Sequence, residues 1–174
     1  TTVSPPNDTL RTTAGELGSL MGADFDGARP AGIHFEGPFI NHVRRGAHRP
    51  ENVVKPDATA FKQWIDASGS SLRLITVAPE LEGIDEIIAL AVAKGIRVAV
   101  GHSNATFAET IRALDNGANY AVHTFNAMRE FSHREPGIAG AVLGDLCHHA
   151  QAGRFDARRQ EEAGRWLGQP LPAA

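Results

Sequence analysis

Three side chains able to bind a metal ion stand at or near the ends of short apolar segments. Glu36 ends the segment GIHFEG, His102 ends RVAVGH, and His123 lies late in YAVHTF. If these segments are parallel strands, their carboxyl ends meet on one face, where the loops of β/α folds build active sites. Two imidazoles and one carboxylate suit Zn²⁺, Fe²⁺ or a similar divalent ion. Three protein ligands also leave a position open for water.

The same three residues have a second interpretation. A histidine at a strand end is commonly a structural residue held by hydrogen bonds. The intervals of 66 and 21 residues (102 − 36 and 123 − 102) fit β/α units but are not specific to a metal site. The pattern alone therefore leaves both interpretations open. Glu80 also ends an apolar segment; it could reach the rim of the site, but we expect it to fix a loop.

The elements that must position these residues alternate between strand and helix patterns. Short runs rich in Val and Ile, bounded by Gly, Pro, Asn or Ser, predict strands at 31–36, 72–78, 97–102 and 120–125. Residues 1–4 resemble the end of another strand, followed by a helix at about 9–21. We therefore expect about five strands and four or five helices.

Three further helices carry start and stop signals. Asp57 is placed to cap the first and Gly69 to end it, and Lys94 and Gly95 end the second. Thr106 and Glu109 form a capping box for the third, and Gly117 is its stop. The predicted buried stripes are Phe61, Trp64 and Ile65; Ile84, Ile87, Ile88, Ala91 and Val92; and Phe107, Ile111 and Leu114.

Strands and helices in this order predict an α/β fold with a parallel sheet and right-handed crossovers. An eight-stranded barrel needs about 250 residues, so 174 residues would supply only part of one. An open doubly wound sheet would be complete at this length, and periodicity does not choose between the two. No GxGxxG loop follows a strand, which argues against a nucleotide-binding sheet.

Composition excludes several classes of protein. With 42% hydrophobic and 21% charged residues the chain is typical of a globular domain, and a net charge of −3 favours neither a nucleic-acid nor a membrane partner. The single Cys147 fits a reducing compartment. The first ten residues have neither a basic nor an apolar run, so we expect no signal peptide.

Residues 146–174 are polar and predict a tail that is disordered or one helix, near 156–166.

Several blocks of the chain resemble the N-acetylglucosamine-6-phosphate deacetylases. They are GIHFEGPFINHVRRGAH (32–48), ITVAPE (75–80), GHSNAT (101–106), HTFNAM (123–128) and HREPGIAGAVL (133–143). The resemblance covers about residues 1–144. It implies that 1–145 form a partial (β/α)8 barrel with outer helices, at about strands 2 to 6, and that 146–174 are an unmatched tail.

The resemblance also implies roles for individual residues. Glu36, His102 and His123 would be metal ligands, for Zn²⁺ first, with Fe²⁺ or another divalent ion as alternatives. Ala47, His48, Asn126, Ala127 and Arg134 would contact an amino-sugar phosphate, because a guanidinium and free backbone N–H groups suit a phosphate. An ion pair of Arg134 with Glu130 or Glu135 is the structural alternative. His34, His42 and His133 are not implicated.

The implied reaction is hydrolysis of the acetamide of N-acetylglucosamine-6-phosphate to glucosamine-6-phosphate and acetate. Family members carry an Asp on a late strand as general base and then general acid, and it has no counterpart in this sequence. We therefore expect an incomplete enzyme of low activity. The alternative is a catalytically dead remnant that binds metal or sugar phosphate. The resemblance further implies a cytoplasmic enzyme whose full-length form is a homo-oligomer.

Overall fold

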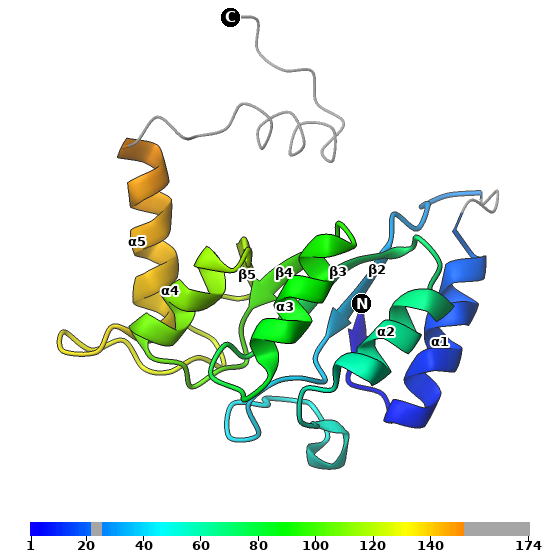
Figure 1. Cartoon of the computed structure of the whole chain (residues 1–174), viewed down its shortest axis with the longest axis horizontal. Helices are drawn as coiled ribbons and strands as arrows, with labels where there is room; N and C mark the ends of the chain where they lie inside the picture. Colours follow the sequence, from blue (N-terminus) through cyan, green and yellow to red (C-terminus); the bar gives the residue numbers. More distant parts are fainter. Residues whose placement is uncertain (22–25, 152–174) are drawn as a thin grey trace, which may run out of the picture. The chain divides into compact units, whose positions relative to one another are not determined.

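The computed structural model describes residues 1–21 and 26–151 (Figure 1). The chain divides into two compact units, Thr1–Ala141 and Val142–Ala174. Within the second unit only residues 142–151 are described, and they belong to helix α5 (Gly137–Gln151). All of the strands and the site residues considered below lie in the first unit.

Five parallel strands form one sheet in the order β1-β2-β3-β4-β5. Every strand therefore pairs with the strands that precede and follow it in the chain. The strands are β1 (Thr2–Val3), β2 (Ile33–Glu36), β3 (Leu72–Val77), β4 (Arg97–Val100) and β5 (Tyr120–Ala121).

A helix follows each of the first four strands: α1 (Asn7–Ser19), α2 (Ala58–Ala67), α3 (Ile84–Ala93) and α4 (Phe107–Asp115). A short 3₁₀ helix, η1 (Pro50–Asn52), lies in the loop before α2. Helices α1, α2 and α3 lie side by side over the same face of the sheet (Figure 1). Sequential strands joined by right-handed crossovers place successive helices on one face, as in a barrel, whereas a doubly wound sheet reverses its order and covers both faces. The partial barrel is confirmed, and the doubly wound sheet is wrong.

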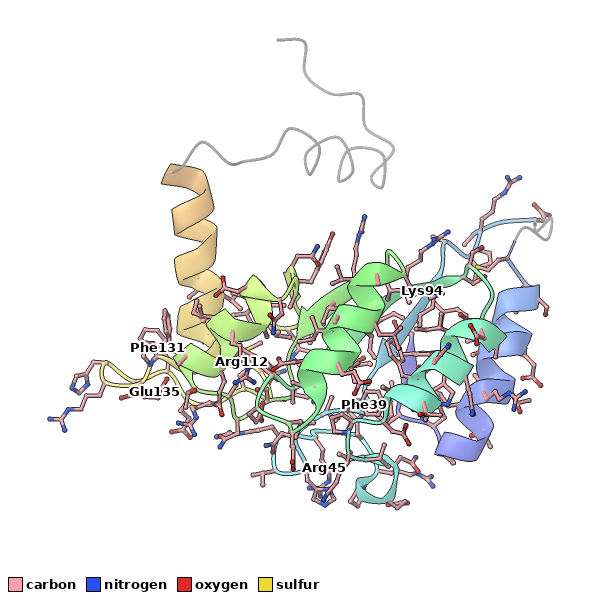
Figure 2. All side chains as sticks on the ribbon, in the orientation of Figure 1. Phe39, Arg45, Lys94, Arg112, Phe131 and Glu135 are labelled. Carbon is pink, nitrogen blue, oxygen red and sulfur yellow. The ribbon has the colours of Figure 1, made fainter. Side chains whose placement is uncertain are left out.

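Aromatic side chains fill the space between β2 and α2. Phe35 of β2 meets Trp64 of α2 edge to face, with ring centroids 6.3 Å apart. Phe39, labelled in Figure 2, stacks on Trp64 at 5.5 Å and meets Phe61 edge to face at 6.2 Å. Such pairs add about 0.5–1.5 kcal/mol each beyond the burial of their area. This cluster fixes the helix against the strand that carries Glu36.

The helix signals are confirmed, but two of the predicted stripes are partly wrong. Asp57 accepts from the N–H of Ala60, and Thr106 and Glu109 form the complete capping box. Val92 is 45% exposed and Phe107 38% exposed, although both were expected in buried stripes. The buried residues of α4 are Thr110 and Ala113, while Ile111 and Leu114 of the predicted stripe are only partly buried.

Two of the predicted strands end earlier than expected. Strand β4 stops at Val100 and β5 at Ala121, so His102 and His123 lie in the loops that follow. The reason is backbone conformation: φ is +46° at His102, +31° at His123 and +77° at Phe125. These left-handed values are incompatible with an extended strand.

The predicted boundary at residue 145 falls inside α5, so a separate tail from 146 stays a prediction. The helix expected near 156–166 lies outside the described residues. Among the described residues, no helix is both long enough and apolar enough to cross a membrane.

Candidate metal centre

The sheet brings Glu36, His102 and His123 to one point at the carboxyl ends of β2, β4 and β5. Glu36 is the last residue of β2, and each histidine follows its strand by two residues. The Nε2 atom of His102 lies 3.1 Å from Glu36 Oε1 and 3.0 Å from His123 Nε2. Glu36 Oε1 and His123 Nε2 are 3.6 Å apart. Residues separated by 66 and 21 positions in the sequence thus present three ligand atoms to a common centre.

Backbone carbonyls fix the tautomer of both histidines. His102 Nδ1 lies 3.0 Å from the carbonyl oxygen of Arg44, and His123 Nδ1 lies 3.0 Å from that of Asn126. A carbonyl only accepts, so each ring carries its proton on Nδ1 and leaves the Nε2 lone pair free for another partner. A carbonyl partner on the second nitrogen is the usual support of a metal-binding histidine.

Three electron-pair donors therefore face one another. Two Nε2 lone pairs and a carboxylate oxygen within 3.0–3.6 Å repel unless a cation or an added proton lies between them. The set of two nitrogens and one oxygen suits Zn²⁺ and similar ions, so these residues fit a divalent metal. His102 is buried while His123 is exposed, which leaves one side of the group open.

Nearby imidazoles keep Glu36 ionised. Burial alone would raise the pKa of its carboxyl group. When the added proton is on His102 Nε2, the hydrogen bond with His102 and the charges of His102, His48 and His34 outweigh that effect and lower the pKa. The carboxylate is therefore available as a negatively charged ligand at neutral pH.

His48 lies beside this group, on the loop after β2 that Arg45 marks in Figure 2. Its side chain is buried, with Nε2 3.9 Å from Glu36 Oε1 and its ring 4.6 Å from that of His102. Its Nδ1 is hydrogen-bonded to Ser4 Oγ at 2.8 Å. Burial and the charge of His102 lower the pKa of His48, against the opposing effect of Glu36. A neutral imidazole thus presents Nε2 beside the metal group.

Sequence reasoning did not identify Ser4. This buried residue follows β1 with φ of +33°, and its carbonyl accepts a hydrogen bond from Asn52 at 2.7 Å. A side-chain Cβ at Gly37 would lie 2.4 Å from Ser4 Oγ, so the glycine is what lets the hydroxyl reach His48. The only available signal was the position of Ser4 at the end of the first predicted strand.

The three histidines to which the sequence assigned no role in the site do not belong to the ligand group. His34 Nε2 is hydrogen-bonded to Thr76 Oγ1 at 2.8 Å, and burial lowers the pKa of His34 despite the charge of Glu36. His42 and His133 are exposed on loops.

The two predicted phosphate contacts on the loop after β5 differ in whether their backbone N–H group is free to bind an anion. The N–H of Asn126 donates to the carbonyl of His123 at 2.8 Å, so it is not free to bind an anion, contrary to expectation. Within residues 1–21 and 26–151 no acceptor takes the N–H of Ala127, which has φ of +51°. Ala47, predicted to contact the sugar, is exposed on the loop after β2, next to His48.

Arg134 is exposed on the loop before α5. Its backbone N–H donates to Ser132 Oγ at 3.4 Å. In the described part of the chain its guanidinium forms neither of the ion pairs considered from the sequence. Glu135 instead accepts from the N–H groups of Phe107 and Gly137, at 2.7 and 3.0 Å. The structure thus leaves the guanidinium available to a ligand but does not bring it into contact with the metal group.

Comparison with curated proteins finds relatives that are named as deacetylases of N-acetylated amino-sugar phosphates. The chain is 36% identical over 144 residues to the N-acetylglucosamine-6-phosphate deacetylase of Lysinibacillus sphaericus, a match that covers 82% of this chain and 37% of the relative. It is 41% identical over 121 residues to the rat enzyme of the same name, a match that covers 68% of this chain and 30% of the relative. The N-acetylgalactosamine-6-phosphate deacetylase of Escherichia coli O157:H7 is 36% identical over 145 residues (83% and 38%). No family model matches the chain.

Solved structures give the same result. The N-acetyl-D-glucosamine-6-phosphate deacetylase of Mycobacterium smegmatis superposes with a TM-score of 0.73 at 38% identity, over 79% of this chain and 35% of that one. A variant of that enzyme in complex with N-acetyl-D-glucosamine-6-phosphate superposes equally well. The chain thus spans about 30–38% of the length of these proteins.

Proposed function

We propose that this protein hydrolyses N-acetylglucosamine-6-phosphate, because the chain belongs to the N-acetylglucosamine-6-phosphate deacetylase family. The amide C–N bond of the acetamide breaks and water adds to the carbonyl carbon, which yields acetate and glucosamine-6-phosphate. The chain covers only 30–38% of its curated relatives, so the reaction is proposed for the protein as a whole.

The observation that carries this proposal is the convergence of Glu36, His102 and His123 at the carboxyl edge of the sheet. We propose that these three residues hold one divalent ion, with Zn²⁺ as the preferred metal because two imidazoles and a carboxylate match its ligand chemistry. Such an ion supplies Lewis acidity toward an amide carbonyl and toward water.

The remaining residues bind and orient the substrate in this proposal. His48 has one ring nitrogen occupied by Ser4 and the other directed to the metal group, so Nε2 is the atom that would hydrogen-bond the substrate. Ala127 would offer its backbone N–H, and Arg134 its guanidinium, to the 6-phosphate. Ala47 and the side chain of Asn126 complete the proposed contacts. A cytoplasmic location and a homo-oligomeric full-length protein are parts of the proposal that rest on family resemblance.

Arg134→Ala is expected to weaken binding of the sugar phosphate by about tenfold to a hundredfold. The reason is that a charge-assisted hydrogen bond contributes roughly 1.5–3 kcal/mol. Unphosphorylated N-acetylglucosamine should bind the variant and the parent chain equally. Isothermal calorimetry of the Zn²⁺-loaded chain with both sugars measures the difference.

Arg45→Ala is a suitable control, since it removes an arginine from a different loop whose guanidinium donates to the carbonyl of His42. Equal losses for both sugars in the Arg134 variant would mean that Arg134 supports the fold and does not bind the phosphate. Failure of the parent chain to prefer the phosphorylated sugar would contradict the proposed substrate. N-acetylgalactosamine-6-phosphate belongs in the same series, because one relative carries that specificity in its name.

A further inference from the structure

Glu80 follows β3 and binds two other loops at once. Its Oε1 accepts hydrogen bonds from Asn41 Nδ2 at 2.9 Å and from the backbone N–H of Asn104 at 2.6 Å. Its Oε2 accepts from the hydroxyl of Ser103 at 2.7 Å. The loop-fixing role expected from the sequence is thus confirmed. The loops it joins are those that follow β2 and β4, on either side of its own strand.

The first connection leads to the ring of His102. Asn41 Oδ1 accepts from the N–H groups of Val43 and Arg44, at 2.8 and 3.2 Å, and so closes a turn. That turn presents the carbonyl of Arg44 to His102 Nδ1. The nitrogen of the same side-chain amide, Asn41 Nδ2, donates to Glu80. Glu80 therefore determines which way the amide faces, and with it the position of the carbonyl that sets the tautomer of His102.

The second connection leads to the backbone of His102. Ser103 and Asn104 follow His102 directly, and both donate to Glu80. The carbonyl of His102 accepts the N–H of Asn41 at 2.8 Å. His102 has φ of +46°, a conformation that is unfavourable for a residue with a side chain and persists only where its surroundings fix it. Glu80 and Asn41 together fix the backbone on the carboxyl side of this residue.

We infer that Glu80 is a positioning residue for the metal centre: by its hydrogen bonds it holds the ring and backbone of His102 in the orientation that directs Nε2 at Glu36 and His123. This inference rests on the metal site proposed above. Glu80 is not itself one of the three ligands. It binds the loop that contains His102 and the loop whose carbonyl holds the His102 ring, in the way that outer partners orient metal-binding histidines.

The arrangement of the donors predicts that Glu80 positions His102 through its hydrogen bonds and not through its charge. Two of the three donors cannot act as acceptors, and both bind Oε1. One is the backbone N–H of Asn104; the other is Asn41 Nδ2, whose amide cannot flip because its oxygen accepts the N–H groups of the turn. The Ser103 hydroxyl on Oε2 can rotate and accept instead. A glutamine at position 80 can therefore keep all three bonds without a charge. An aspartate keeps the charge but is one methylene too short to reach both loops.

The test is a titration of the 174-residue chain with Zn²⁺ in competition with a chromophoric chelator, repeated with Co²⁺ to record its visible spectrum. Glu80→Asp is expected to weaken metal affinity about tenfold and to change the Co²⁺ spectrum. Glu80→Gln should bind within about twofold of the parent chain and share its spectrum. Glu109→Asp is the matched control. The carboxylate of Glu109 accepts from the N–H and hydroxyl of Thr106 at 2.8 Å each, and no bond links it to His102.

Each outcome separates this inference from the proposed metal site. Parent-like affinity and spectrum in Glu80→Asp would overturn the positioning role, as would a loss in Glu80→Gln equal to that in Glu80→Asp. An equal loss in Glu109→Asp would show that general destabilisation causes the effect. If the folded parent chain binds no divalent metal, the proposed site itself is wrong and the inference falls with it.

Discussion

Replacement of His102 by alanine is expected to lower the affinity of the chain for Zn²⁺ by about 10²- to 10³-fold. A structural zinc site with four ligands contributes roughly 10–16 kcal/mol, or about 2.5–4 kcal/mol for each ligand. His102 is the central member of the proposed ligand group, because its Nε2 lies within 3.1 Å of Glu36 Oε1 and His123 Nε2 and its Nδ1 is held by the carbonyl of Arg44. Competition with a chromophoric chelator at pH 7 measures the change.

His42→Ala is the matched control for this prediction. It deletes the same side chain from an exposed loop position outside the ligand group. The control should bind Zn²⁺ as the parent chain does. An unchanged affinity in His102→Ala would show that the three residues are held together by hydrogen bonds alone and form no metal site.

The 174-residue chain by itself is expected to hydrolyse N-acetylglucosamine-6-phosphate at least about 10²-fold more slowly than a complete relative. Proton transfer by a positioned general base contributes typically 10²–10⁴-fold to such a reaction. In the described part of the chain, Glu36 is the one carboxylate of the metal-capable group, and Glu80 is engaged by two loops. A carboxylate that binds a metal is a poor proton acceptor, so neither of these two carboxylates is placed to serve as the general base.

Release of acetate, followed with saturating Zn²⁺ and substrate, tests this prediction. The Lysinibacillus sphaericus relative under the same conditions is the positive control. A turnover number of about 1–10³ s⁻¹, the usual range of enzymes, would contradict the prediction. Metal and sugar-phosphate binding without turnover would favour the alternative of a binding remnant.

The helices were predictable because their signals are local. Asp57 and the pair Thr106 and Glu109 lie within three residues of the N–H groups they bind, so the sequence contains the whole interaction. The convergence of Glu36, His102 and His123 was also accessible, since parallel strands of similar length end on one edge.

The backbone around the ligands could not be read from periodicity. YAVHTF alternates as a strand does, yet His123 and Phe125 adopt left-handed conformations and the strand ends at Ala121. Such conformations cluster at functional sites because the surrounding loops impose them. No propensity of the residues themselves encodes that constraint.

Contacts between distant loops account for the remaining omissions. The hydrogen bond between Ser4 and His48 spans 44 residues, and Glu80 binds Asn41 across 39. Val92 and Phe107 have the spacing of buried residues, but the described chain leaves both partly exposed. Burial depends on which element packs against a helix face, and a helical stripe does not specify its partner.

Zinc K-edge X-ray absorption of the chain loaded with one equivalent of Zn²⁺ measures the ligands of the proposed metal centre. We expect an inner shell with two imidazole nitrogens at about 2.0–2.1 Å and a carboxylate oxygen at about 2.0–2.2 Å. The imidazole scattering should fall by half in His123→Ala and stay unchanged in His42→Ala. A shell of oxygen atoms without imidazole scattering would contradict a metal centre built from Glu36, His102 and His123.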